Sequence, residues 1–251
     1  MNLVVDLNAD LGEGAGHDAE LFELISSASI ATGFHAGDAG TMHAAVLGAK
    51  AHGVAVGAHP SFFDRENFGR KERKVSPEEV SDGVAYQLGI FQAIATAAGL
   101  LPNHVKPHGA LYNMAVRDET LAEAIARAIK SVDSKLILFA PDNTELARAG
   151  EAQGLQIARE VFADRNYLAD GWLVSRTRAD ALLNNPVEAA KRVLRMLREG
   201  KVQSVDGSDV NVRAETICVH GDTPGAVEFA RELRSQLVSQ GVRICAPDRL
   251  A

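Results

Sequence analysis

Several features that mark specialised classes of protein are missing or scarce in this sequence of 251 residues. Two cysteines, Cys218 and Cys245, are too few for a disulfide framework, and both lie in apolar runs where cysteine usually packs as a small hydrophobic side chain. No stretch approaches the ~20 apolar residues that a membrane-spanning helix needs. Basic residues are in deficit, with 26 Lys and Arg against 33 Asp and Glu, which argues against a nucleic-acid or membrane-surface binder.

The remaining composition is that of an ordinary globular protein. Hydrophobic residues make up 46% and charged residues 24%, which excludes disordered and fibrous classes. The opening residues MNLVVDLNAD contain no basic segment and no long apolar stretch, so we expect no signal peptide and a reducing, cytoplasmic location. Without a linker or low-complexity tract, residues 1–251 are expected to form a single domain. Whether copies of the chain form a homo-oligomer stays open.

Short apolar runs alternate with segments of helical spacing along the whole chain. The runs rich in Val and Ile fall at residues 3–7, 28–32, 54–58, 104–106, 136–139, 157–162, 216–219 and 242–245. Helix starts are marked by the capping box at Ser76–Glu79, by Asn185-Pro186 before a segment ending at Gly200, and by Thr223-Pro224. This alternation predicts an α/β fold, a TIM-like (β/α) barrel of seven or eight strands. An open, doubly wound sheet is the alternative.

Two segments interrupt this rhythm and are expected to be insertions on the barrel rim. Residues 61–75 form a long, charged polar loop. Residues 165–209 carry one helix and enter a predicted hairpin at 202–212, whose turn would be Asp206-Gly207.

Polar residues that are able to do chemistry follow almost every apolar run. Active sites of α/β barrels form at the C-terminal ends of the strands, where side chains from different strands converge. Singly, these residues could be turn residues, backbone-bonded histidines or a rim lysine, but such explanations would have to hold together at six strand ends. We therefore predict one pocket lined by Asp10, His35, His59, Lys106, His108, Asp164 and His220.

The motifs that are absent restrict the chemistry of this pocket. The sequence has no P-loop, no HExxH, no cysteine pair spaced for zinc and no GxSxG elbow, so a serine or thiol nucleophile is not supported. Carboxylates, imidazoles and an amine remain, and they suit activation of water with proton transfer to a leaving nitrogen or oxygen. They could also bind a divalent metal, with Asp10, His35 and His59 as candidate ligands. The residues alone do not separate these two interpretations.

Long motifs around these residues resemble a known family. They are DLNADLGEG (6–14), IATGFHAGD (30–38), GAHPSFFDRENFGR (57–70), VKPHGALYN (105–113), EVFADR (160–165) and VHGD (219–222). Together they resemble the LamB/YcsF family, the A subunits of prokaryotic ATP-dependent 5-oxoprolinases, from the first strand to the last. Two positions depart from the family pattern: Thr32 stands where many members carry Cys, and Phe63 where they usually carry Pro.

The resemblance implies a barrel related to glycoside hydrolases and polysaccharide deacetylases. It also implies a reaction in which 5-oxo-L-proline, ATP and water give L-glutamate, ADP and phosphate, with B and C subunits as partners. ATP would be a co-substrate, with Mg²⁺ as its companion ion. Lys106 with Arg65 or Arg70 would hold phosphate charge, and Asp10 or a histidine would be the base for water.

Residue roles follow from these expectations. We predict Asp10, His59, Lys106 and His108 as catalytic residues. The predicted substrate-binding residues are Asn8, His35, Asp38, Arg65, Arg70, Asp164, Arg165, His220 and Asp222. Two other functions stay open: a metal-dependent deacetylase or amidohydrolase that acts alone, and a non-catalytic lactam-binding subunit.

Overall fold

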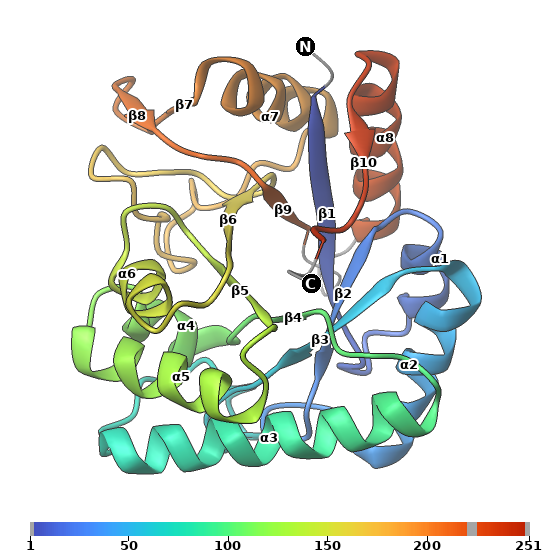
Figure 1. The fold of residues 1–251 in the computed structure, drawn as a ribbon. Coiled ribbons are helices and arrows are strands. Elements are labelled where there is room, and N and C mark those ends of the chain that lie inside the picture. Colours follow the sequence, from blue (N-terminus) through green and yellow to red (C-terminus); the bar gives the residue numbers. More distant parts are fainter. Residues whose placement is uncertain (1–2, 220–224, 249–251) are drawn as a thin grey trace.

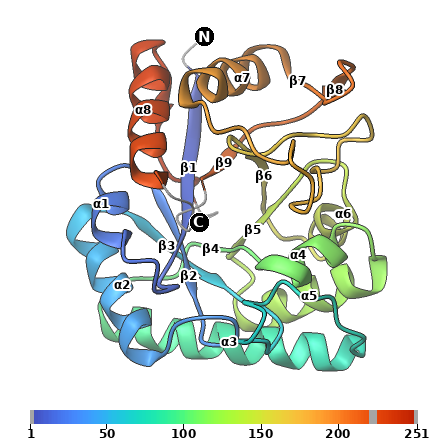
Figure 2. The ribbon, with the colours of Figure 1, turned by 180° about the vertical axis from the view of Figure 1, so that it is seen from behind.

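Seven parallel strands close into a barrel in the computed structural model, which describes residues 3–219 and 225–248 (Figures 1 and 2). Each strand pairs with the next, and β1 pairs with β9 to close the ring. The barrel strands are β1 (Val4–Leu11), β2 (Ser27–Ala31), β3 (Ala55–His59), β4 (His104–Val105), β5 (Ile137–Ala140), β6 (Ile157–Phe162) and β9 (Thr216–Val219). The predicted barrel is confirmed, and the open-sheet alternative is wrong. An additional short strand, β10 (Arg243–Ile244), pairs with the first residues of β1.

Helices surround this barrel on its outside (Figures 1 and 2). They are α1 (Asp18–Phe22), α2 (Ala39–His52), α3 (Pro77–Ala97), α4 (Gly109–Ala115), α5 (Glu119–Val132), α6 (Glu145–Ala152), α7 (Pro186–Glu199) and α8 (Ala226–Ser239). The capping box of Ser76 and Glu79 opens α3 as predicted. Asn185 caps α7, which ends at Gly200 in the left-handed conformation. The predicted start of the last helix, Thr223-Pro224, lies outside the described residues.

The side chains of β1 alternate between the apolar shell beneath the helices and the barrel interior. Leu7, Ala9 and Leu11 are buried in the hydrophobic core that the helices cover. The alternate residues Asp6 and Asn8 are equally buried, but they form hydrogen bonds to side chains of β6 and β9 across the interior. Because strand residues alternate between two faces, β1 carries apolar groups outward and polar groups inward, whereas Ile137, Phe139 and Ala158 of β5 and β6 form a separate apolar cluster.

β1 extends four residues beyond the end of the apolar run that predicted it. The run at 3–7 ends where the polar residues begin, yet the strand continues to Leu11, paired with β2 and β9. Asn8 and Asp10 lie within the strand, since their polar side chains have partners inside the barrel. A pattern based on apolarity alone reads such residues as a turn.

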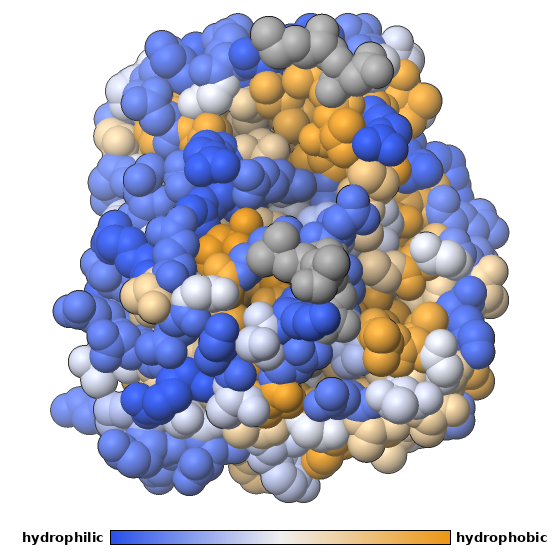
Figure 3. All heavy atoms as spheres, viewed as in Figure 1, coloured by the Kyte–Doolittle hydropathy of each residue, from blue (hydrophilic) through white to orange (hydrophobic). Residues whose placement is uncertain are grey.

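The two predicted insertions are present. Residues 61–75 form a loop without a helix or strand, and residues 165–209 carry α7 and enter a hairpin of β7 (Lys201–Gln203) and β8 (Asp209–Asn211). Gly207 supplies the positive φ of the hairpin turn. Polar residues cover most of the face shown in Figure 3, while apolar residues gather near the start of β1 beside α8. Among the described residues, no helix is long and apolar enough to cross a membrane.

The buried carboxylate of Asp6 makes a testable contribution to stability. Burial raises its pKa from 3.8 to about 6, although hydrogen bonds from Ser26 and Thr216 oppose the shift. A carboxyl whose pKa is higher in the folded state stabilises the fold below its unfolded pKa, and this stabilisation is lost as pH rises through the folded pKa. The shift corresponds to about 3 kcal/mol.

We therefore predict that wild type loses stability relative to Asp6→Asn, which cannot titrate, as pH rises from about 4 to 7. Urea unfolding of both proteins across this range measures the difference. A difference that does not change with pH would contradict the assignment.

Candidate active site

The ammonium group of Lys106 lies inside the barrel, just beyond β4, and is 3% exposed. Its Nζ approaches side chains from three other strands: Asp10 Oδ1 at 2.8 Å, Asn8 Oδ1 at 2.9 Å, Cys218 Sγ at 2.9 Å and Glu160 Oε1 at 3.1 Å. An ammonium group has three N–H donors, so these four acceptors already engage all of them. Lys106 therefore holds the strand ends together and orients Asp10.

Charge balance explains how this lysine remains buried. Burial opposes the ammonium form, but the carboxylates of Asp10 and Glu160 outweigh it and raise the pKa of Lys106 well above its ordinary value. Glu160 also accepts a hydrogen bond from the hydroxyl of Tyr112, at 2.6 Å. Burial raises the pKa of the Cys218 thiol well above its ordinary value, so this cysteine is not an activated nucleophile.

Three histidines and a glutamate form a second cluster beside this pair. His59 ends β3, His35 follows β2, and His108 precedes α4. Glu13 Oε1 lies 2.9 Å from His35 Nε2, and His59 Nε2 lies 2.9 Å from His108 Nδ1. One ligand atom from each of the four residues lies within 4.8 Å of the other three. Such a group has the donor atoms of a transition-metal site.

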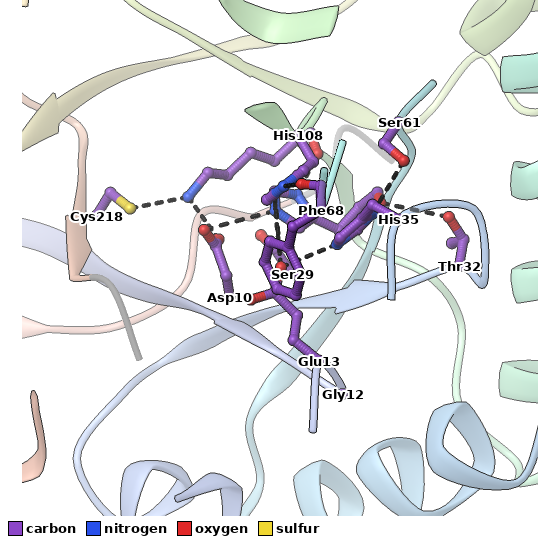
Figure 4. Close-up of polar contacts among 12 residues, drawn as sticks. Asp10, Gly12, Glu13, Ser29, Thr32, His35, Ser61, Phe68, His108 and Cys218 are labelled. Carbon is purple, nitrogen blue, oxygen red and sulfur yellow. Dashed lines mark hydrogen bonds and ion pairs between the residues drawn. The ribbon is translucent and has the colours of Figure 1, made fainter. Parts of the chain in front are cut away.

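Asp10 joins the two clusters. Its Oδ1 accepts from Lys106, and its Oδ2 lies 3.5 Å from His59 Nε2. Figure 4 shows Asp10 between Cys218 on one side and His35 and His108 on the other. Its side chain is 10% exposed, against 4% for Lys106, so the carboxylate is the more accessible member of the ion pair.

The loop at residues 61–75 packs directly on the histidine cluster. Ser61 Oγ lies 3.0 Å from His35 Nδ1, and the backbone oxygen of Phe68 lies 2.9 Å from His108 Nε2. Gly69 has a φ of +64°, and a Cβ there would come within 2.8 Å of His35 Cβ. The loop can approach this closely only with glycine at that position.

Burial also affects the protonation of these rings. It lowers the pKa of His108 to about 3, and His59 adds to this effect. The pKa of His35 falls further, first through burial and then through His108 and His59. Both rings are therefore neutral at physiological pH, when a ring nitrogen can act as an acceptor or a ligand.

The structure brings only some of the predicted residues together. Asp10, His35, His59, Lys106 and His108 converge as the strand-end pattern indicates, with Asn8 below them and Asp164 buried just beyond β6. Arg70 lies near the cluster, with its guanidinium 5.0 Å from the ring centre of Phe68. His220 and Asp222 lie outside the described residues.

Three residues predicted to bind substrate make structural contacts. Asp38 is the exposed N-cap of α2 and accepts from the backbone of Thr41. Arg65 donates to the backbone oxygens of Gly33 and Gly37. Arg165 is buried and donates to the backbone oxygen of Val174. These contacts fix loops around the site.

The strand-end pattern overlooked Glu13 and Glu160, which complete the two clusters. Glu13 stands between two glycines of the first motif, where it reads as part of a flexible turn. Glu160 interrupts the apolar run of β6, and a charged residue inside a buried strand is a signal that could have identified it.

The two departures from the family pattern lie beside the site. Thr32 donates to Gln87 Oε1 at 2.7 Å, and this amide also accepts from the backbone of Ser61. A hydroxyl at position 32 thus supports the base of the rim loop. Phe63 is 65% exposed and packs edge-on against Phe34, with ring centres 5.3 Å apart.

Comparison with known proteins places this arrangement in a family. The LamB/YcsF family matches residues 5–251. The chain belongs to the LamB/YcsF family. It is 51% identical over 246 residues to the A subunit of 5-oxoprolinase from Rhodopseudomonas palustris (strain BisA53), covering 96% of each sequence.

Solved structures agree with this placement. The lactam utilization protein of Thermus thermophilus superposes with a TM-score of 0.92 at 48% identity, covering 98% of this chain and all of that one (100%). The T48 deacetylase, at 14% identity, matches with a TM-score of 0.51 over 97% of this chain and 87% of its own. At that identity the likeness shows the fold alone.

Removing the charge of Lys106 tests the ion network of this LamB/YcsF protein. Lys106→Met leaves the carboxylates of Asp10 and Glu160 without their cation, and we predict a loss of about 3–5 kcal/mol in the free energy of unfolding. Chemical denaturation measures it. Lys191→Met, on the exposed side of α7, is the matched control and should change stability far less. Equal effects of the two variants would show that the network does not stabilise the fold.

Proposed function

We propose that this chain is the A subunit of an ATP-dependent 5-oxoprolinase. With B and C subunits in the cytoplasm, it would convert 5-oxo-L-proline to L-glutamate as ATP is hydrolysed to ADP and phosphate. The observation that carries the proposal is its near full-length similarity, at 51% identity, to a protein named as the A subunit of 5-oxoprolinase. The relative of known structure is named a lactam utilization protein, which agrees with a lactam substrate.

The reaction requires an activated lactam carbon and a base for the attacking water, and the site offers candidates for the base. A five-membered lactam is a poor electrophile because amide resonance stabilises it. Phosphorylation of its oxygen would create an imidate-like carbon that water can attack. Asp10, ionised beside Lys106 and partly accessible, is the proposed base for that water. Histidines 59 and 108, within the same pocket, are proposed to contact the reacting group.

The second requirement is a site for ATP and Mg²⁺, and no such site is evident among the described residues. The sequence has no P-loop, and the donors of Lys106 are already engaged by the barrel. Arg70, beside Phe68 on the rim, is the cation best placed to meet a phosphate. We therefore propose that the partner subunits supply most of the nucleotide site, docking on the rim formed by residues 61–75.

Partner dependence gives the first test of this proposal. The purified chain, given 5-oxoproline, ATP and Mg²⁺, should form little or no glutamate, and adding B and C subunits should start both glutamate formation and phosphate release. Full activity of the chain alone, without ATP, would instead favour a hydrolase that acts alone. A mixture of folded partners no more active than the chain would refute the assignment.

The role of Asp10 gives the second test. Asp10→Asn keeps the shape of the side chain and removes its charge, and we predict a loss of turnover in the assembled enzyme of roughly 10²-fold or more. Assembly with the partners, followed by gel filtration, controls for misfolding. Turnover within a few-fold of wild type would favour a non-catalytic, lactam-binding subunit.

A further inference from the structure

His59 and His108 face each other through one ring nitrogen each, and the hydrogen bonds of the other two ring nitrogens determine where the protons lie. His59 Nδ1 lies 2.6 Å from the backbone oxygen of Lys106, and His108 Nε2 lies 2.9 Å from that of Phe68. A carbonyl oxygen only accepts, so both of these ring nitrogens carry hydrogen. When both rings are neutral, the other nitrogen of each has a lone pair, and these two nitrogens, His59 Nε2 and His108 Nδ1, are 2.9 Å apart.

Two lone pairs at this distance repel unless a positive charge lies between them. A proton could bridge them, but it would convert one ring into an imidazolium whose side chain is at most 7% exposed. Burial opposes that charge, whereas the carboxylates of Asp10 and Glu13 nearby favour a positive charge at this point, whether it comes from a proton or from a metal ion. A metal ion accepts both lone pairs, and the two backbone carbonyls already orient the rings as the hydrogen-bonding partners of metal-bound histidines usually do.

Glu13 provides the third ligand atom. Its Oε1 lies 3.5 Å from His108 Nδ1 and 3.8 Å from His59 Nε2. A point equidistant from three atoms separated by 2.9, 3.5 and 3.8 Å is about 2.0 Å from each, the length of zinc bonds to imidazole nitrogen and carboxylate oxygen. The three atoms are thus already spaced for one ion.

His35 has a different place in this cluster. Its ring is stacked on that of His108, with centres 3.8 Å apart and planes inclined by 7°. An ion in the plane of His108 lies well out of the plane of His35, where an imidazole has no lone pair. His35 can instead donate from Nε2 to Glu13 Oε1, at 2.9 Å, so it orients the glutamate.

From this geometry we infer that His59 Nε2, His108 Nδ1 and Glu13 bind one divalent transition-metal ion, with His35 as a positioning residue for Glu13. Two imidazoles and one carboxylate suit Zn²⁺ and its neighbours, whereas Mg²⁺ prefers oxygen ligands alone. Three protein ligands leave at least one position open to an oxygen of a bound molecule, as in catalytic zinc sites. The inference does not depend on the proposed activity.

Metal titration of the full chain tests the site directly. Chelator-treated protein is titrated with Zn²⁺ by calorimetry, and the visible spectrum of Co²⁺-loaded protein is recorded. We expect one ion per chain for wild type and for His43→Ala, which removes an exposed histidine on α2. His59→Ala, His108→Ala and Glu13→Gln should lose this binding, and His35→Ala should weaken it by about 10- to 100-fold.

Circular dichroism of each variant separates loss of a ligand from loss of the fold, and the wild-type titration stands even if a histidine variant unfolds. The inference is overturned if wild type binds neither Zn²⁺ nor Co²⁺, or if folded His59→Ala and His108→Ala bind like wild type. A loss in His35→Ala as complete as in His59→Ala would overturn the proposed ligand set. Activity assays are not needed for any of these outcomes.

Discussion

The buried ammonium group of Lys106 is the constraint on which the rest of the site depends. A charge inside a barrel is stable only when opposite charges and acceptors compensate it, and here β1, β6 and β9 each direct a side chain toward the same nitrogen. This requirement explains why β1 carries Asn8 and Asp10 inward and why β6 places Glu160 within an apolar run. The polar side chains around this nitrogen follow from one cation, and the apolar shell beneath the helices supplies hydrophobic stabilisation.

The same network connects the barrel to its rim. One oxygen of Asp10 binds Lys106 and the other lies 3.5 Å from His59, so the carboxylate links the ion pair to the histidine cluster. The loop at 61–75 then closes over the histidines through Ser61, Phe68 and Gly69. The contacts that stabilise the barrel are thus continuous with the side chains proposed to react. They extend from the barrel interior to the surface on which partner subunits are proposed to dock.

The sequence predicted the alternation of strands and helices, the capping residues of α3 and α7, and the meeting of five side chains at the strand ends. The prediction was less accurate at polar residues, because a polar side chain can belong either to an exposed turn or to a buried site. Asn8 and Asp10 resemble turn residues in the sequence but extend β1. Arg65 was predicted to hold phosphate charge, and its guanidinium donates to two backbone carbonyls. Glu13 was overlooked because its position depends on contacts with His35 and His108 that are remote in sequence. Local patterns identify which residues can do chemistry, whereas the fold decides which of them meet.

A double-mutant cycle between Lys106 and Asp10 tests this account most directly. The free energies of unfolding of wild type, Lys106→Met, Asp10→Asn and the double variant give the interaction energy of the pair. If the ammonium group organises the site, Asp10→Asn should cost much less in the Lys106→Met background, with an interaction energy of about 1–3 kcal/mol. Additive effects of the two substitutions would contradict the account, since they would show that the two side chains are independent.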